Sequence, residues 1–138
     1  MIMKIRIDHI GIAVKSLDES SVFWKLLGLT NDQADQHNEE QGVNIRFLPT
    51  SSGKPPQLEL LEPTGDDTPI GKFLASHGPG IQQLAFEVED ISEMIRHLIK
   101  NGVRMIDDVP RDGAHGTQIA FVHPKSTGGV LVELVQYV

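Results

Sequence analysis

The stretch Asp8-His9-Ile10-Gly11-Ile12-Ala13-Val14 decides the fold of this chain, because its pattern returns as Gln82-Gln83-Leu84-Ala85-Phe86-Glu87-Val88. The shift that places His9 on Gln83, called the repeat shift from here on, also aligns the later residues without a gap up to residue 60. Similarity at a fixed offset is typical of a duplicated structural unit. We therefore predict two equivalent halves. The aligned pairs include Ser16 with Asp90, Glu19 with Glu93, Gly28 with Gly102, Phe47 with Phe121, and Glu59 with Glu133.

The length and charge of the chain limit its function. Its 138 residues are enough to bury the core of a domain, and 19 acidic against 12 basic side chains give a formal charge of −7. A chain this acidic lacks the basic face that non-specific nucleic-acid binding requires, so we expect no nucleic-acid partner. There is no cysteine, so any metal site must use nitrogen and oxygen ligands.

Two further features bear on location. No apolar run approaches the ~20 residues of a membrane-spanning helix, and Met1-Ile2-Met3-Lys4 does not begin a secretory signal. We therefore expect no membrane partner and a cytoplasmic protein.

The first half has the pattern of one strand, one helix and three further strands. Residues 5–14 alternate between apolar and small or polar side chains, which indicates a half-buried strand. Ser16 and Glu19 form a capping box for a helix that ends at Gly28. The remaining strands are expected near 30–36, over 43–48 and over 57–62, with a turn over 51–56.

The second half repeats this order after a linker helix that Thr68-Pro69 begins and Gly78 ends. Asp90 and Glu93 cap the second long helix. The strands of this half are expected over 83–88, near 103–108, near 117–123 and over 129–137.

Four polar residues stand mid-strand among apolar neighbours, namely His9, Glu59, Gln83 and Glu133. Taken singly, His9 could fill space and the two glutamates could face solvent. However, the members of the pairs His9–Glu59 and Gln83–Glu133 are equally far apart in the sequence, which favours a joint site. A divalent metal bound by one imidazole, one amide oxygen and two carboxylates would satisfy all four groups.

The sequence therefore predicts an α+β fold of two tandem βαβββ modules that form a concave mixed sheet around one metal site. We expect a single domain over 1–138. It would consist of repeat 1 at about 4–63, the linker helix at about 68–77 and repeat 2 at about 80–138.

Nearly the whole chain resembles the vicinal-oxygen-chelate superfamily, which includes glyoxalase I and bleomycin-resistance proteins, and within it the methylmalonyl-CoA epimerases. The opening stretch from Asp8 to Val14 is common to the superfamily. His123-Pro124-Lys125, leading into Gly129-Val130-Leu131-Val132-Glu133-Leu134, is more specific to the epimerases. The resemblance also rests on Gln57 to Pro63 and on Gly113 to Gly116.

The resemblance implies that His9, Glu59 and Glu133 are metal ligands, and that Gln83 stands where the epimerases have a histidine. Glutamine binds a metal through its amide oxygen, and the set His, Glu, Gln, Glu resembles that of eukaryotic glyoxalase I with its halves exchanged. The implied cofactor is a divalent metal: cobalt, zinc, manganese, nickel or magnesium.

The implied chemistry is proton abstraction beside the thioester carbonyl of an acyl-CoA, with Glu59 and Glu133 as the expected bases on opposite faces. One base that the family carries on the strand at 43–48 has no counterpart here, because that strand offers Asn44 and Arg46.

The loop cations Lys125, Arg111 and Lys54 are expected to bind CoA phosphates, with solvated loop charge as the alternative. His115, between glycines, indicates either a mobile loop near the site or a simple turn. The expected partners are a small acyl-CoA substrate and a second copy of the chain, as a homodimer.

Three function classes remain open. The first is a metal-dependent epimerase of an acyl-CoA, the second a glyoxalase I-type lactoylglutathione lyase, and the third a non-catalytic binding module of the bleomycin-resistance type. An extradiol dioxygenase is disfavoured, because its iron site needs two histidines and a carboxylate and only His9 is available. Bound metal distinguishes the third class from the others, and loss of a hydrogen label at C2 of methylmalonyl-CoA distinguishes the first from the second.

Overall fold

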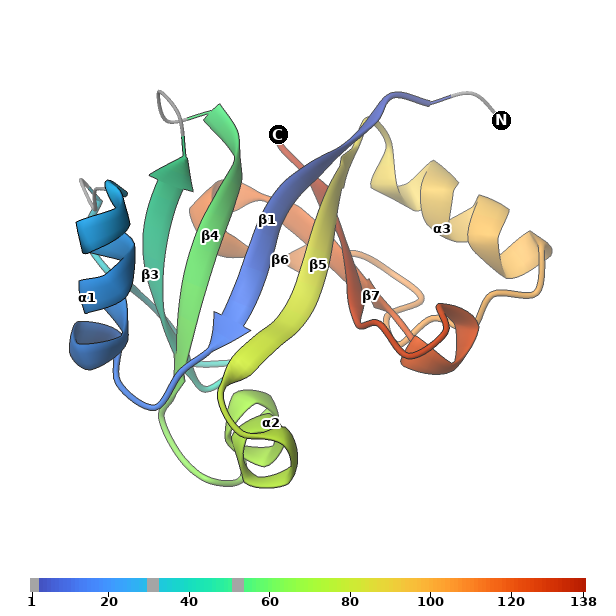
Figure 1. Ribbon diagram of the computed structural model, residues 1–138. Coiled ribbons are helices and arrows are strands. Elements are labelled where there is room, and N and C mark those ends of the chain that lie inside the picture. The colour runs from blue at the N-terminus through green and yellow to red at the C-terminus, as the bar shows by residue number, and fades with distance from the viewer. Residues whose placement is uncertain (1–2, 30–32, 51–53) are drawn as a thin grey trace. The chain divides into compact units, whose positions relative to one another are not determined.

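The computed structural model of this chain describes residues 3–29, 33–50 and 54–138 (Figure 1). A strand, a helix and three strands occur twice, which confirms the predicted α+β class and the two βαβββ modules. No helix in this described part is long and apolar enough to cross a membrane. In chain order the elements are β1 (Ile5–Ala13), α1 (Leu17–Leu27), β2 (Gln36–Asn38), β3 (Val43–Thr50), β4 (Lys54–Pro63), α2 (Pro69–His77), β5 (Gly80–Val88), α3 (Ile91–Lys100), β6 (Arg111–Asp112), η2 (Ala114–Gly116), β7 (Gln118–Val122), η3 (Pro124–Ser126) and β8 (Val132–Gln136).

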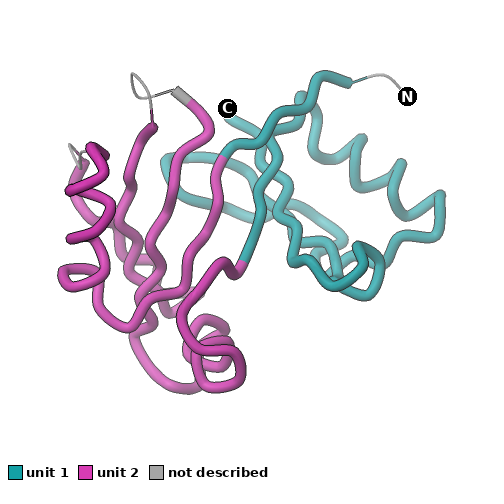
Figure 2. Tube along the Cα trace, viewed as in Figure 1, with its two compact units in different colours: residues 1–8, 83–138 teal, residues 9–82 magenta. Residues whose placement is uncertain are grey.

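The chain divides into two compact units, coloured separately in Figure 2. Unit 2 contains residues 9–82, and unit 1 contains residues 1–8 together with 83–138. In unit 2 the strand order is β2-β3-β4-β1, with β1 parallel to β4 and the other neighbours antiparallel. In unit 1 the order is β5-β8-β7-β6, and only β5 and β8 are parallel.

The central strands of the two units are paired in the same register, once the repeat shift is applied. The glutamate of each unit lies opposite a small residue on its parallel neighbour and opposite a phenylalanine on its antiparallel neighbour. The repeat in the sequence is therefore a repeat of backbone pairing. The pairs Gly11–Glu59 and Phe47–Glu59 of unit 2 correspond to Ala85–Glu133 and Phe121–Glu133 of unit 1.

The capping predictions for the two long helices are confirmed. The Ser16 hydroxyl accepts a hydrogen bond from the backbone N–H of Glu19 at 3.2 Å, and the Asp90 carboxylate accepts one from that of Glu93 at 3.0 Å. Each side chain satisfies one of the N–H groups that a helix leaves unpaired at its start. Gly28 ends α1 with a φ of 118°, in the left-handed region that favours glycine.

A second cap at each helix comes from β4 or β8. The backbone N–H of Leu17 donates to Glu62 at 2.9 Å, and the N–H of Ile91 donates to Gln136 at 2.8 Å. These contacts are equivalent under the repeat shift, and they fasten each helix to the last strand of its own unit. The capping partners lie 45 residues away in the sequence, so no local pattern predicts them.

The predictions for the outer strands were wrong. β2 covers Gln36–Asn38, not 30–36, and residues 30–32 lie outside the described part. β6 covers Arg111–Asp112, whereas near 103–108 only Met105 forms an isolated bridge, to Val122.

The outer strands also depart from the register of the repeat. Ile45 and Ile119 are equivalent under the repeat shift, but Ile45 pairs with Gln36 and Ile119 pairs with Arg111. The repeat shift would bring Gln36 onto Pro110, so the outer strands correspond with a slip of one position. Such short edge strands take their place from their neighbour rather than from their own alternation.

The remaining strands extend or shorten the predicted ranges. The strand predicted over 57–62 begins earlier, at Lys54, and takes in part of the predicted turn over 51–56, of which residues 51–53 lie outside the described part. The strand predicted over 129–137 is restricted to Val132–Gln136.

Equivalent residues form the core between helix and sheet in each unit. Val14, Leu17, Leu48 and Leu60 pack together in unit 2. Their counterparts in unit 1 are Val88, Ile91, Val122 and Leu134, within a larger cluster that also contains Met94 and Ile95. Burial of such side chains contributes roughly 1.5–3 kcal/mol each to folding.

The substitution Leu60→Ala is expected to lower the free energy of unfolding by about 2–5 kcal/mol, because Leu60 is fully buried and its truncation leaves a cavity. Leu134→Ala, at the equivalent position of unit 1, is the matched comparison and should cost a similar amount. Urea denaturation measures both. A loss below about 1 kcal/mol for either variant would contradict a rigid core at this layer.

Candidate functional site

His9 and Glu59 form a buried pair on neighbouring parallel strands of unit 2. The Nδ1 atom of His9 lies 3.2 Å from Oε2 of Glu59, and the two side chains are only 6% and 8% exposed. Gly11 lies opposite Glu59 on β1. An imidazole and a carboxylate held this way share a hydrogen bond or ligate a common cation.

A third buried ionisable side chain, that of Asp8, lies beside this pair and is 2% exposed. Ligand atoms of Asp8, His9 and Glu59 lie within 4.8 Å of one another, so the three make a candidate metal-binding group. The Tyr137 hydroxyl donates to Oδ1 of Asp8 at 2.6 Å. The sequence did not single out Asp8, because strand alternation directs neighbouring side chains to opposite faces, and its tyrosine partner lies 129 residues away.

Gln83 and Glu133 form the corresponding pair in unit 1. The side-chain amide nitrogen of Gln83 donates to Oε1 of Glu133 at 2.7 Å, and Glu133 is 5% exposed. The hydrogen bond assigns the amide orientation, with the nitrogen directed towards the carboxylate. The two pairs that the sequence predicted are therefore in contact, each within its own unit.

Both glutamates have apolar surroundings. Phe47 lies opposite Glu59 and is 1% exposed, and Phe121 lies opposite Glu133 and is 8% exposed. In unit 1 the same face carries a buried cluster of Ala85, Ile119, Phe121 and Val135. Opposed residues in an antiparallel pair lie on the same face of the sheet, so each carboxylate has an aromatic side chain as neighbour and little water.

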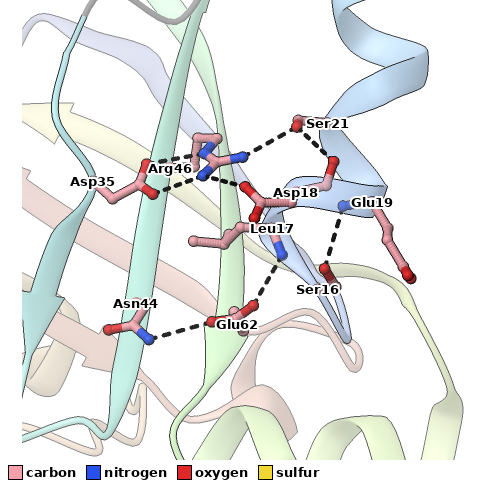
Figure 3. A network of polar contacts seen from close by, with 9 residues as sticks. All are labelled: Ser16, Leu17, Asp18, Glu19, Ser21, Asp35, Asn44, Arg46 and Glu62. Atoms are coloured by element: carbon pink, nitrogen blue, oxygen red, sulfur yellow. Dashed lines mark hydrogen bonds and ion pairs between the residues drawn. The ribbon is translucent and has the colours of Figure 1, made fainter.

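Asn44 and Arg46 of β3 lie opposite Glu62 and Leu60, and they alternate with Phe47, so they occupy the face of the sheet away from Glu59. Arg46 donates to both oxygens of Asp35 at 2.9 and 2.8 Å, and to Asp18 of α1 at 2.9 Å (Figure 3). These hydrogen bonds, above all the one to Asp35, raise the pKa of the Arg46 side chain above its ordinary value. The network joins α1 to the sheet of unit 2.

The predicted phosphate-binding cations of unit 1 lie on β6 and in the turn after β7. Arg111 has its Nε atom 3.5 Å from Oδ1 of Asp107, and its guanidinium lies 5.7 Å from the centre of the Phe121 ring. Lys125 lies exposed in η3. The side chain of Lys54 is outside the described part. His115 is an exposed residue of η2 with a φ of 56°, so it lies in a tight turn in the left-handed region.

The sequence of this chain is similar to a known family and to individual proteins of known sequence. A family model described as the glyoxalase/bleomycin resistance protein/dioxygenase superfamily matches residues 8–121. The chain is 43% identical over 135 residues to an uncharacterised protein of Bacillus subtilis, covering 95% of this chain and 91% of that protein. It is 37% identical over 133 residues to human mitochondrial methylmalonyl-CoA epimerase, covering 95% and 73%.

A solved structure shows the same likeness in three dimensions. A variant of methylmalonyl-CoA epimerase from Streptomyces coelicolor, in complex with 2-nitronate-propionyl-CoA, has a TM-score of 0.88 and 42% sequence identity, covering 96% of this chain and 94% of that chain. The fold of the whole chain is therefore that of these enzymes.

Proposed function

We infer that this chain, a member of the glyoxalase/bleomycin resistance protein/dioxygenase superfamily, is an isomerase of the methylmalonyl-CoA epimerase type. The observation that carries this conclusion is its likeness, over 96% of its length, to an epimerase solved with an acyl-CoA analogue. Relatives from human and Dictyostelium discoideum bear the same name. The substrate is a malonyl-type thioester of CoA. Its C2 carbon, which carries the proton to be removed, is bonded to both the thioester carbonyl and the carboxylate.

We propose that His9, Glu59, Gln83 and Glu133 bind one divalent metal ion within a single domain over 1–138, built from repeat 1, the linker helix and repeat 2. Each unit supplies one pair of nitrogen and oxygen atoms in contact. The set of one imidazole, one amide oxygen and two carboxylates fits cobalt, zinc, manganese, nickel or magnesium. When bound, such an ion supplies Lewis-acid polarisation of the substrate's carbonyl oxygens.

Proton transfer is assigned to the two glutamates. Each is buried opposite a phenylalanine, so water competes little for the transferred proton. One carboxylate removes the C2 proton from one face, and the other carboxylic acid returns a proton to the opposite face. The number of protons on the protein is unchanged after one turnover, and the configuration at C2 is inverted.

A glyoxalase I-type lyase is the second candidate, because the donor set His, Glu, Gln, Glu is the one it resembles. Both functions are decided by one experiment. The purified protein is analysed for bound metal and incubated in heavy water with methylmalonyl-CoA, with and without added cobalt. We expect metal-dependent incorporation of deuterium at C2. Bound metal without deuterium incorporation at C2, together with turnover of a glutathione hemithioacetal, would establish the lyase instead. Binding of either compound without bound metal and without turnover would establish a binding module.

We further propose that the protein is a cytoplasmic homodimer that pairs through α1. Val22, Phe23, Leu26 and Leu27 are 55–82% exposed along this helix. Asp18 and Glu19 lie in its first turn and Lys25 in its last. Antiparallel packing of two copies about a two-fold axis places each acidic turn beside the partner's basic turn, which makes the face complementary to itself.

The substitution Leu26→Asp is expected to convert the dimer into a monomer, because it places a charge at the most exposed leucine of this apolar face. Sedimentation velocity at several protein concentrations measures the change. Ile99→Asp makes a comparable change at the exposed end of α3 and should leave the dimer intact. A wild-type monomer at high concentration, or a variant that stays dimeric, would contradict pairing through α1.

A further inference from the structure

Asp8 and Tyr137 form a contact within unit 1 that the proposed ligand set does not include. Asp8 is buried, and its Oδ1 atom accepts a hydrogen bond from the Tyr137 hydroxyl at 2.6 Å. Tyr137 is only partly buried, yet its hydroxyl reaches a carboxylate that has little contact with water. A buried carboxylate is unfavourable unless hydrogen bonds or a cation compensate for its lost hydration. The chain thus keeps a carboxylate inside the protein and directs a specific donor at it.

Asp8 also lies beside two of the proposed metal ligands. It directly precedes His9 on β1, and ligand atoms of Asp8, His9 and Glu59 lie within 4.8 Å of one another. Asp8 and Glu59 are both buried carboxylates. Two negative charges this close repel each other more strongly inside a protein than in water, and a divalent cation beside them offsets the repulsion. The arrangement therefore favours binding of a cation.

The Asp8–Tyr137 contact has no counterpart in the repeat. Under the repeat shift Asp8 corresponds to Gln82 and Tyr137 corresponds to Pro63. The equivalent pair would therefore offer neither a negative charge nor a hydroxyl. Because the same strand position carries a neutral side chain on β5, the strand itself does not require the charge of Asp8. The charge then has a role that only one half of the duplicated fold performs.

We propose that Asp8 and Tyr137 are positioning residues of the metal site. The Asp8 carboxylate strengthens binding of the divalent ion by the neighbouring His9–Glu59 pair, and the tyrosine hydroxyl holds that carboxylate in place. This proposal rests on the proposed function, which supplies the metal site. Asp8 acts from outside the ligand set, through its charge, because the four proposed ligands and two substrate oxygens complete the positions around an octahedral ion. Groups that lie behind metal ligands commonly change metal affinity by roughly 10–100-fold.

The test is calorimetric titration with manganese and with cobalt, after a chelator has removed any bound metal. We expect Asp8→Asn to weaken binding of either ion about tenfold or more, because asparagine keeps an oxygen for the Tyr137 hydroxyl but removes the charge. Tyr137→Phe keeps the charge and removes one hydrogen bond, so its affinity should fall by a smaller factor, about two- to tenfold. Asp108→Asn removes an equal charge from an exposed position of unit 1 and is the matched control, with unchanged affinity.

Urea unfolding of the metal-free proteins separates this role from a purely structural one. Asp8→Asn keeps the size of the side chain and the hydrogen bond from Tyr137, so we expect its unfolding midpoint to equal that of the wild type. A lower midpoint together with unchanged metal affinity would overturn the proposal and make the contact a structural one. Should Asp8→Asn fail to fold, Tyr137→Phe decides: weaker metal binding supports the proposal, and unchanged binding overturns it.

The titration also distinguishes failure of this proposal from failure of the proposed function. If the wild-type protein binds metal but does not epimerise methylmalonyl-CoA, the epimerase assignment fails, and the affinities of the variants still decide the role of Asp8. If the wild-type protein epimerises the substrate and all variants bind metal equally well, the epimerase assignment stands and the positioning role is overturned. A wild-type protein that binds neither ion would overturn the positioning role as well.

Discussion

Replacing Glu133 by alanine, Glu133→Ala, is expected to remove both metal binding and turnover. The carboxylate is 5% exposed and accepts the Gln83 amide at 2.7 Å, so its loss removes one proposed ligand and disorders another. Loss of a catalytic base alone costs roughly 10²–10⁴-fold in rate, and loss of the metal adds to this. Elemental analysis of the purified variant and the rate of deuterium incorporation at C2 measure the two effects.

Two further variants separate the roles of this side chain. Glu133→Gln keeps an oxygen that accepts the Gln83 amide but cannot take a proton at neutral pH, so we expect it to retain part of the metal and lose the turnover. Glu93→Gln makes the same chemical change at an exposed position of α3 and should alter neither quantity. Wild-type metal content and rate in Glu133→Ala would place the site elsewhere.

The substitution Gln83→His is expected to raise the affinity for cobalt or zinc by about tenfold or more, because changes in the ligand shell of a metal often have effects of that size. An amide oxygen is a weaker donor than imidazole for these late transition metals. The wild-type protein should accordingly tolerate manganese or magnesium better than the variant does. Calorimetric titration of both proteins with the same ion gives the comparison.

Ser92→His is the matched control for this experiment. It introduces the same imidazole at an exposed position of α3, outside the proposed ligand set. Its metal affinity should equal that of the wild type. If Gln83→His and wild-type protein bind the ion equally well, Gln83 does not contact the metal, and a metal-free binding module becomes the better assignment.

The sequence determined the parts of this protein whose causes are local or periodic. The alternation in residues 5–14 and the capping signals at Ser16 and Asp90 predicted β1, α1 and α3, because neighbouring residues in a strand or helix terminus dictate these elements. The fixed offset went further. By aligning Glu59 with Glu133 it predicted a joint site from the pairs His9–Glu59 and Gln83–Glu133. The structure shows that the two members of each pair are in contact.

The resemblance contributed the identity of the chemistry, which the pattern itself lacked. An alternating strand with a mid-strand glutamate is compatible with a solvent-facing sheet. Only the specific stretch around His123-Pro124-Lys125 and Glu133 indicated an epimerase, and the comparison with the Streptomyces coelicolor enzyme confirmed that resemblance over almost the whole chain.

The tertiary structure decided the features that depend on residues far apart in the sequence. The slip of the outer strands by one position, the hydrogen bond from Tyr137 to Asp8, and the position of Arg104 beside His123 all belong here. Arg46 is the clearest case: the sequence placed it on the strand of a missing base, and the structure shows it bound to Asp35 and Asp18 on the other face. A local pattern determines which residues form a strand and which of them share one face of the sheet. It does not determine which side chain from another element arrives opposite them, because that choice is made by the free energy of packing the whole unit.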